Sequence, residues 1–155
     1  MRGKRAKQRK VQPERKYGSL LVTKLIHGVM LHGKKDLARR IVYTAMEEGA
    51  EKLKLDPMDF LNGAINNVKP SMEVKARRVG GANYHIPVPV PPARQETLAI
   101  RWVVNAARNK SGMPMVERLK KELLDAYNGE GESVKKRDEM HRMAEANKAF
   151  AHFRW

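Results

Sequence analysis

Apolar residues return every three or four positions through most of the chain, which is the period of an α-helix with one buried face. In the first half this pattern predicts three helices, over residues 19–33, about 35–52 and 56–70. Asp56 followed by Pro57 is typical of a helix start, and Gly33 favours a helix end. Each of the three predicted helices therefore has an apolar face and residues that delimit it.

The period changes to two between about residues 72 and 90, on either side of the pair at Gly80 and Gly81. Alternation around a glycine pair predicts a β-hairpin, with Val74, Ile86 and Val88 on one apolar face. The prolines at 87, 89 and 91 are spaced so that all three missing N–H donors lie on the same outer edge. We therefore expect an isolated two-stranded ribbon whose outer edge resists further pairing.

Helical periods resume after Pro92 and predict three more helices, over about 92–111, 114–129 and 135–147. Trp102 and Tyr127 fall at core positions of that period, so we interpret them as core residues rather than base-stacking ones. The pattern leaves open whether the closing aromatic residues Phe150, Phe153 and Trp155 pack on the domain or on a partner. The predicted fold is mainly α, a single domain of about six helices with a protruding two-stranded β-hairpin arm.

The charge of the chain is strongly positive and unevenly distributed. The 155 residues include 32 Lys and Arg against 17 Asp and Glu, a formal net charge of +15. Residues 1–16 hold eight basic residues, one acid and few apolar residues, so we expect a disordered basic arm that a nucleic acid orders, ahead of a single helical domain over 17–155. Such concentration is typical of a polyanion-binding protein. A membrane surface is disfavoured because no basic amphipathic helix with an aromatic face is present.

Several function classes are excluded by missing residues. The chain has no cysteine, so disulfides, thiolate zinc sites and cysteine nucleophiles are excluded, and its five histidines form no zinc-binding pair. The spacing from Gly28 to Gly33 and Lys34 approaches a phosphate-binding loop, but Lys35 occupies the Ser/Thr position and no strand precedes it. We expect no enzyme activity, no cofactor or metal, no small-molecule substrate and no membrane segment.

Four segments carry a family resemblance. Gly33-Lys34-Lys35 lies between the apolar residues of the first two predicted helices, and the others are residues 72–84, Ala99-Ile100-Arg101-Trp102 and residues 143–155. With these segments the whole chain resembles the bacterial-type small-subunit ribosomal protein seven. The resemblance implies a cytoplasmic, ribosomal protein. Such a protein is a primary binder of small-subunit rRNA in the 3′ major domain, and it nucleates assembly of the head of the small subunit. It also implies that ribbon and last helix lie near exit-site tRNA, the mRNA path and neighbours such as protein eleven.

The basic residues expected to contact rRNA are Arg2, Lys4, Arg5, Lys7, Arg9, Lys10, Lys34, Lys35, Lys75, Arg94, Arg101, Lys135 and Lys136. Those expected near tRNA and mRNA are Arg77, Arg78, Gly80, Gly81, Asn83, Tyr84 and Arg142. Arginine makes bidentate phosphate contacts and tyrosine offers a stacking face for a base. The alternative for the ribbon is a solvated charged edge without a ligand.

The chain departs from the family pattern at two positions near expected basic contacts. His32 precedes Gly33 where the family usually has Asp, and Gln95 follows Arg94 where the family usually has a second basic residue. The uncharged side chain of Gln95 therefore does not supply the phosphate contact that the resemblance implies at this position. Gly28, inside the first predicted helix, is expected to weaken that helix by about 1 kcal/mol relative to Ala.

The alternative function is an architectural DNA-binding protein, because a helical body with a basic ribbon also suits a minor groove. DNA-bending arms carry an apolar wedge at the tip, whereas Gly80, Gly81, Ala82 and Asn83 offer none. The tip therefore favours RNA over DNA.

Overall fold

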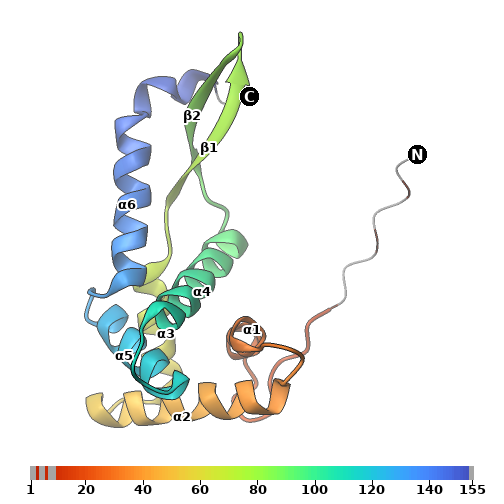
Figure 1. Ribbon diagram of the computed structural model, residues 1–155, viewed down its shortest axis with the longest axis vertical. Helices are drawn as coiled ribbons and strands as arrows, with labels where there is room; N and C mark the ends of the chain where they lie inside the picture. Colours follow the sequence, from red (N-terminus) through yellow and green to blue (C-terminus); the bar gives the residue numbers. More distant parts are fainter. Residues whose placement is uncertain (1–2, 4–5, 7–9, 154–155) are drawn as a thin grey trace.

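The computed structural model describes residues 3, 6 and 10–153 of the chain (Figure 1). In chain order its elements are α1 (Leu20–Val29), α2 (Lys35–Leu53), α3 (Pro57–Val68), β1 (Met72–Val79), β2 (Ala82–Pro89), α4 (Pro92–Asn109), α5 (Met115–Tyr127), α6 (Glu132–Ala146) and the short 3-10 helix η1 (Lys148–Phe153). The prediction of a mainly α fold with a β-hairpin arm is confirmed.

Local chemistry explains where the helices begin and end. α3 begins after Asp56, whose side chain accepts a hydrogen bond from the Met58 N–H at 2.9 Å. α1 ends at Val29 rather than at Gly33, because the next residue is already extended and Gly33 has a left-handed φ of 73°. α6 begins at Glu132, earlier than expected, with Ser133 buried in its first turn.

The core lies where α1 to α5 meet, and α2 crosses the end of the body remote from the ribbon (Figure 1). All five apolar residues that the helical period places on the inner face of α3 are buried: Phe60, Leu61, Ala64, Ile65 and Val68. Trp102 and Tyr127, both expected in the core, are half-buried and pack against it from its edge. The inner faces of the helices largely follow the period. Leu37, which the period places in the buried stripe of α2, is nevertheless exposed, and Ile41 in the same stripe is half-buried.

The ribbon pairs antiparallel around a two-residue turn, with Val79 opposite Ala82 and Met72 opposite Pro89. Gly80 and Gly81 occupy the turn with φ of 57° and 90°, a region that glycine enters without strain. Val90 donates its N–H to the carbonyl of Ser71 at 3.0 Å. The backbone nitrogens of residues 86, 88 and 90 therefore face β1, and those of Pro87 and Pro89 face the outer edge, as expected.

The register corrects the predicted apolar face of the ribbon. Lys75 lies opposite Ile86 and Glu73 opposite Val88, whereas Val74 lies opposite Pro87. Because directly opposed side chains share a face, Val74 lies on the other face from Ile86 and Val88. The cause is the two-residue turn, which pairs even-numbered residues of β1 with odd-numbered residues of β2. Charged residues of β1 therefore share a face with apolar residues of β2.

The C-terminal part of the chain supports the ribbon. α6 runs beside it, and η1 contacts β2 near the far end (Figure 1). The ring of Phe150 lies 5.3 Å from that of Tyr84, measured between centroids. Of the three closing aromatic residues, Phe150 therefore packs on its own chain, and Trp155 lies outside the described residues.

The predicted arm over residues 1–16 lies partly outside the described residues, which exclude Arg2, Lys4, Arg5, Lys7 and Arg9. The described part contacts the body from residue 12 onward. The Thr23 hydroxyl donates to the carbonyl of Gln12 at 3.1 Å, Tyr43 donates its hydroxyl to Glu14, and Lys16 pairs with Glu47. Residues 12–16 are thus attached to α1 and α2.

Candidate nucleic-acid interface

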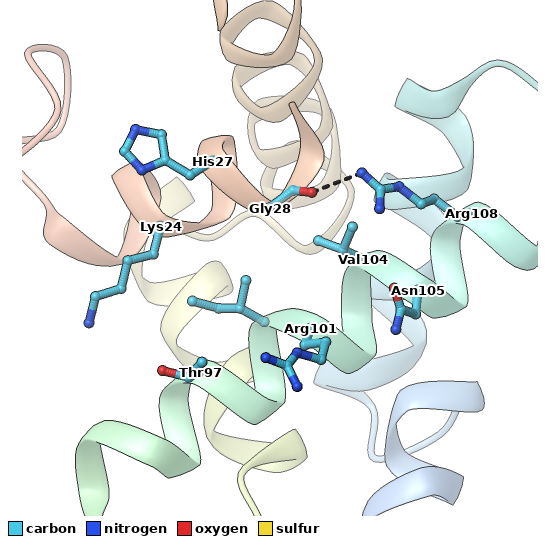
Figure 2. Close-up of a pocket in the computed structure, with 9 residues that line it drawn as sticks. Lys24, His27, Gly28, Thr97, Arg101, Val104, Asn105 and Arg108 are labelled. Carbon is cyan, nitrogen blue, oxygen red and sulfur yellow. Dashed lines mark hydrogen bonds between the residues drawn. The ribbon is translucent and has the colours of Figure 1, made fainter. Parts of the chain in front are cut away.

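A groove with basic side chains lies between α1 and α4, with a volume of about 380 Å³ (Figure 2). From α1 it is lined by Lys24, His27 and Gly28, and from α4 by Thr97, Ile100, Arg101, Val104, Asn105 and Arg108. Its apolar floor comes from Ile100 and Val104, and its polar groups come from the exposed sides of the two helices. The groove therefore combines a packed floor with cations at the rim.

At the floor of this groove, α1 faces α4 at Gly28. A Cβ built at Gly28 would be 3.4 Å from a methyl carbon of Ile100 and of Val104. Glycine thus lowers the intrinsic stability of α1 at a point where this helix contacts α4.

Arg108 joins the two helices at one end of the groove. Its guanidinium donates to the carbonyl of Gly28 at 2.9 Å and to that of Val29 at 3.4 Å (Figure 2). These carbonyls belong to the last turn of α1, where a cation offsets the negative end of the helix dipole. Arg108 is thus oriented by the end of α1 while it remains exposed.

The other cations of the groove differ in their partners. Lys24 pairs with Glu96 at 2.6 Å, whereas Arg101, an expected rRNA contact, is exposed on α4 and forms no ion pair with any described residue. An unpaired guanidinium keeps its donor groups available to a phosphate, to which it binds in a bidentate manner. Arg101 is therefore the residue of the groove best suited to bind an anion.

A second hollow of about 390 Å³ lies on the other side of Arg108, over α1, α2 and α5. Lys34, an expected rRNA contact, lies at its edge with His32, Arg108 and Arg118. Its wall is largely aliphatic and includes the exposed Leu31 and Leu37 among its residues. This hollow therefore again combines cationic side chains with apolar ones.

The expected ribbon residues divide into a base and a tip. At the base, Lys75 and Arg94 both pair with the buried carboxylate of Glu73, at 3.4 and 2.8 Å. At the tip, Arg78 and Asn83 are exposed and lie opposite each other. The remaining expected residues near the tip are the exposed Arg77, Gly80 and Gly81 and the half-buried Tyr84.

The expected residues of α6 lie on the helix that runs along the ribbon. Lys135 pairs with Glu132 at 2.8 Å and Lys136 with Glu139 at 2.6 Å, both within one helical turn. Arg142 is exposed. In the view of Figure 1 the ribbon base, α4 and α1 follow one another on the right, and α6 lies on the left. The start of α6 nevertheless approaches α4, because Lys136 lines a hollow of about 310 Å³ together with Asn105, which also lines the groove.

Of the expected rRNA contacts in the arm, Lys10 is described by the structure and is exposed, as is Lys35 at the start of α2. Lys35 begins α2 and lines a polar hollow of about 400 Å³ with Arg15, Arg39 and residues 12–14. The attached segment 12–16 therefore leads from the basic N-terminal residues to the exposed start of α2.

Three cationic or imidazole side chains of the groove were not predicted from the sequence, namely those of Lys24, His27 and Arg108. None belongs to a basic cluster in the sequence. A weaker signal was available, since Thr97, Arg101, Asn105 and Arg108 are spaced by four, four and three residues. This is a polar helical stripe beside an apolar one. That α1 would border the same stripe depends on the tertiary structure.

The described part of the chain contains no group of three or more His, Asp or Glu side chains placed to hold a metal ion. Among the same residues, no helix has both the length and the apolar character needed to cross a membrane. What the groove does offer is an exposed guanidinium group suited to binding an anion.

Comparison with known proteins gives a consistent result over the whole chain. The sequence model of the family "Ribosomal protein S7p/S5e" matches residues 1–148. A small ribosomal subunit protein uS7 of Kosmotoga olearia is 59% identical over 155 residues, which is 100% of both chains. The protein of the same name from Thermosipho africanus is 54% identical over 155 residues, again 100% of both chains. That of Dictyoglomus turgidum is 58% identical over 147 residues, 95% of this chain and 94% of the relative.

Proposed function

Because the chain belongs to the S7p/S5e family of ribosomal proteins, we propose that it binds small-subunit rRNA through the α1–α4 groove and the ribbon, and nucleates assembly of the head. The chain is a protein of the small ribosomal subunit, located in the ribosome in the cytoplasm, and it is not an enzyme. Its partners are accordingly rRNA and other ribosomal proteins. The proposal concerns which surfaces of the chain make these contacts.

The observation that carries the proposal is the α1–α4 groove with its exposed, unpaired Arg101. A cation without a partner in the protein can meet a phosphate at no cost of breaking an ion pair. Arg101 meets this condition, and Arg108 is held at the end of α1 beside it. The apolar floor between the cations supports contact with a ribose or base edge as well as with phosphate.

Further rRNA contacts are proposed outside the groove. Lys34, Lys35, Lys75 and Arg94, together with the basic residues of the arm from Arg2 to Lys10, are proposed to bind rRNA of the 3′ major domain. Lys135 and Lys136 on α6 are proposed as further rRNA contacts. Since each of the two is paired with a glutamate in its own helix, its contribution is expected to be smaller than that of Arg101.

The ribbon tip and Arg142 are proposed to lie near the exit-site tRNA, the mRNA path and protein eleven. Support comes from the shape, because the tip extends beyond the body while α6 runs along the same arm (Figure 1). Exposed Arg78 and Asn83 at the tip are suited to phosphate and base contacts with a mobile RNA.

The test measures binding of the full chain to a transcript of the 3′ major domain, with chemical footprinting of the RNA. Arg101→Ala is expected to weaken binding and to lower the slope of log affinity against log salt by about 0.7–0.9, the effect of one phosphate contact. Lys121→Ala, which removes an exposed charge from α5, is the matched control and should leave both unchanged. Equal losses in both variants, or equal affinity for duplex DNA of the same length, would refute the proposal.

A further inference from the structure

Two consecutive residues in the first turn of α4 hold the base of the ribbon. The Nε of Arg94 lies 2.8 and 2.9 Å from the two carboxylate oxygens of Glu73 on β1. The side-chain amide of Gln95 donates to the carbonyl of Val90, just after β2, at 3.0 Å. Because both side chains leave the same helical turn, both strands are tied to one rigid part of the body.

Glu73 is buried, with only 5% of its surface exposed, although it belongs to a ribbon that extends away from the body. A buried carboxylate is costly unless cations and hydrogen-bond donors surround it. Arg94 supplies both, and Lys75 adds a cation at 3.4 Å. Moving the ribbon away from α4 would separate Glu73 from Arg94, so the ion pair opposes that movement.

The opposite side of the base is attached to α6. The backbone N–H of Ser71, just before β1, donates to Nε2 of His141 at 3.0 Å. The ribbon is thus held between α4 and α6 at its base. Each strand has eight residues. At about 3.3 Å per residue, a rotation of about 10° at the base would move the tip by about 4–5 Å.

We infer that Arg94 and Gln95 are positioning residues, which set the angle of the ribbon to the α1–α4 groove so that both surfaces meet one RNA. The inference rests on the proposed RNA-binding function. It gives Gln95 a structural role, the hydrogen bond to Val90, at a position where the family usually has a basic residue that would contact phosphate. Arg94 keeps about half of its side chain exposed, so its outer nitrogens remain available to a phosphate while Nε holds Glu73.

The angle is measured by the distance between two spin labels on the full chain. The chain has no cysteine, so Ala82→Cys at the ribbon turn and Lys52→Cys at the end of α2 label two chosen sites. The parent should give a narrow distance distribution. Gln95→Ala, Glu73→Gln and the combination should broaden it progressively at nearly unchanged helical content. Asp36→Asn, which removes a carboxylate from an exposed pair with Arg39, is the matched control and should not broaden it.

Affinity for the 3′ major domain transcript is measured on the same variants. If the released ribbon spends about one fifth of its time at the binding angle, affinity for the transcript falls about fivefold. Saturating RNA should then narrow the distribution of spin-label distances again. An unchanged distance distribution in the combined variant overturns the positioning role, whatever the affinity does. A broadened distribution with unchanged affinity overturns the link to RNA.

A parent chain that fails to bind the transcript would refute the proposed function, while the distances would still decide whether the base is held. If Glu73→Gln does not fold, Gln95→Ala decides the question, because it removes one neutral hydrogen bond and leaves the buried ion pair intact.

Discussion

Two glycines inside helices of the body differ in the space around them. A Cβ at Gly63 on α3 would lie 2.5 Å from a ring carbon of Tyr127, closer than any van der Waals contact. At Gly28 on α1 the nearest atoms are methyl carbons of Ile100 and Val104 at 3.4 Å. Glycine at position 63 is therefore required by the ring packed on α3, whereas position 28 has room for one methyl group.

Alanine at the two positions should have different effects on stability. Gly63→Ala is expected to lower the free energy of unfolding by about 1–3 kcal/mol, because Tyr127 must move. Gly28→Ala should leave it unchanged or raise it by up to about 1 kcal/mol through better helix propensity. Urea unfolding followed by circular dichroism measures both values. A larger loss at position 28 than at 63 would contradict the packing described here.

A titratable cluster attaches segment 12–16 and Tyr17 to α2. The Tyr17 hydroxyl donates to Glu47 at 2.8 Å, and Lys16 also pairs with Glu47. Burial and the hydrogen bond to Glu47 raise the pKa of Tyr17 well above its ordinary value of 10.0. The hydrogen bonds from Lys16 and Tyr17 lower the pKa of Glu47 below its ordinary 4.5.

The two shifts define a pH window for this attachment. Because the pKa of Glu47 is lowered, its ionised carboxylate stabilises the fold above pH 4.5, and this stabilisation is lost as the pH falls. Because the pKa of Tyr17 is raised, its protonated hydroxyl stabilises the fold below pH 10.0, and this stabilisation is lost as the pH rises. Tyr17→Phe, which keeps the ring under Lys16, should therefore cost about 1 kcal/mol at pH 7 and less on either side of the window. Urea unfolding at three pH values measures this, and an equal cost at all three would refute it.

At the scale of elements, the ribbon has a held base and a protruding tip, so changes at the tip should spare folding. Arg77→Ala with Arg78→Ala removes two exposed charges far from the core. We expect stability to change by less than about 0.5 kcal/mol. The variant should enter small subunits normally, and these subunits should hold exit-site tRNA less well.

The matched control for the tip is Lys52→Ala with Lys121→Ala, which removes the same charge from exposed positions of α2 and α5. Melting temperature, incorporation into subunits and tRNA retention are measured on both double variants. If incorporation of the tip variant collapses while the assembled subunits retain tRNA normally, the tip serves assembly rather than tRNA binding.

At the scale of the whole molecule, the N-terminal arm carries a large share of the net charge of +15. Residues 1–10 include six basic residues and no acid, and the contacts with the body that the described residues make begin at residue 12. Removal of residues 1–10 should thus take away charge without disturbing α1 or α2. The arm is expected to supply affinity for RNA that depends little on its sequence, through release of counterions.

Deletion of residues 1–10 should weaken RNA binding at moderate salt and lower the slope of log affinity against log salt. If all six cations meet phosphates, the slope falls by about 4–5. Helical content should stay the same. Titrations at several salt concentrations measure the slope, and a slope equal to that of the full chain would show that the arm does not contact RNA.

Much of the fold follows from local patterns that the sequence carries. The position of α3 follows from Asp56, Pro57 and an apolar period whose members are all buried, because capping and amphipathicity act within a few residues. The place of the ribbon follows from alternation around Gly80 and Gly81, since a two-residue turn needs positive φ. The same turn also determines the register, although the apolar pattern alone led to the wrong face for Val74.

Other features depend on contacts between segments far apart in the chain. Arg101 was identifiable from the sequence, but the groove exists only because α1 packs on α4, which brings Lys24 and Arg108 to its two sides. The burial of Glu73 likewise depends on Arg94 from the next helix.

The sequence by itself thus determined the helices, the ribbon and the excess of positive charge, since these depend on neighbouring residues and on composition. Only the tertiary structure decided which cations share a surface, which of them form ion pairs with carboxylates, and which helices hold the base of the ribbon. The physical reason is that electrostatic and packing partners are selected by distance in space, and local periodicity contains no information about which faces of two helices will meet.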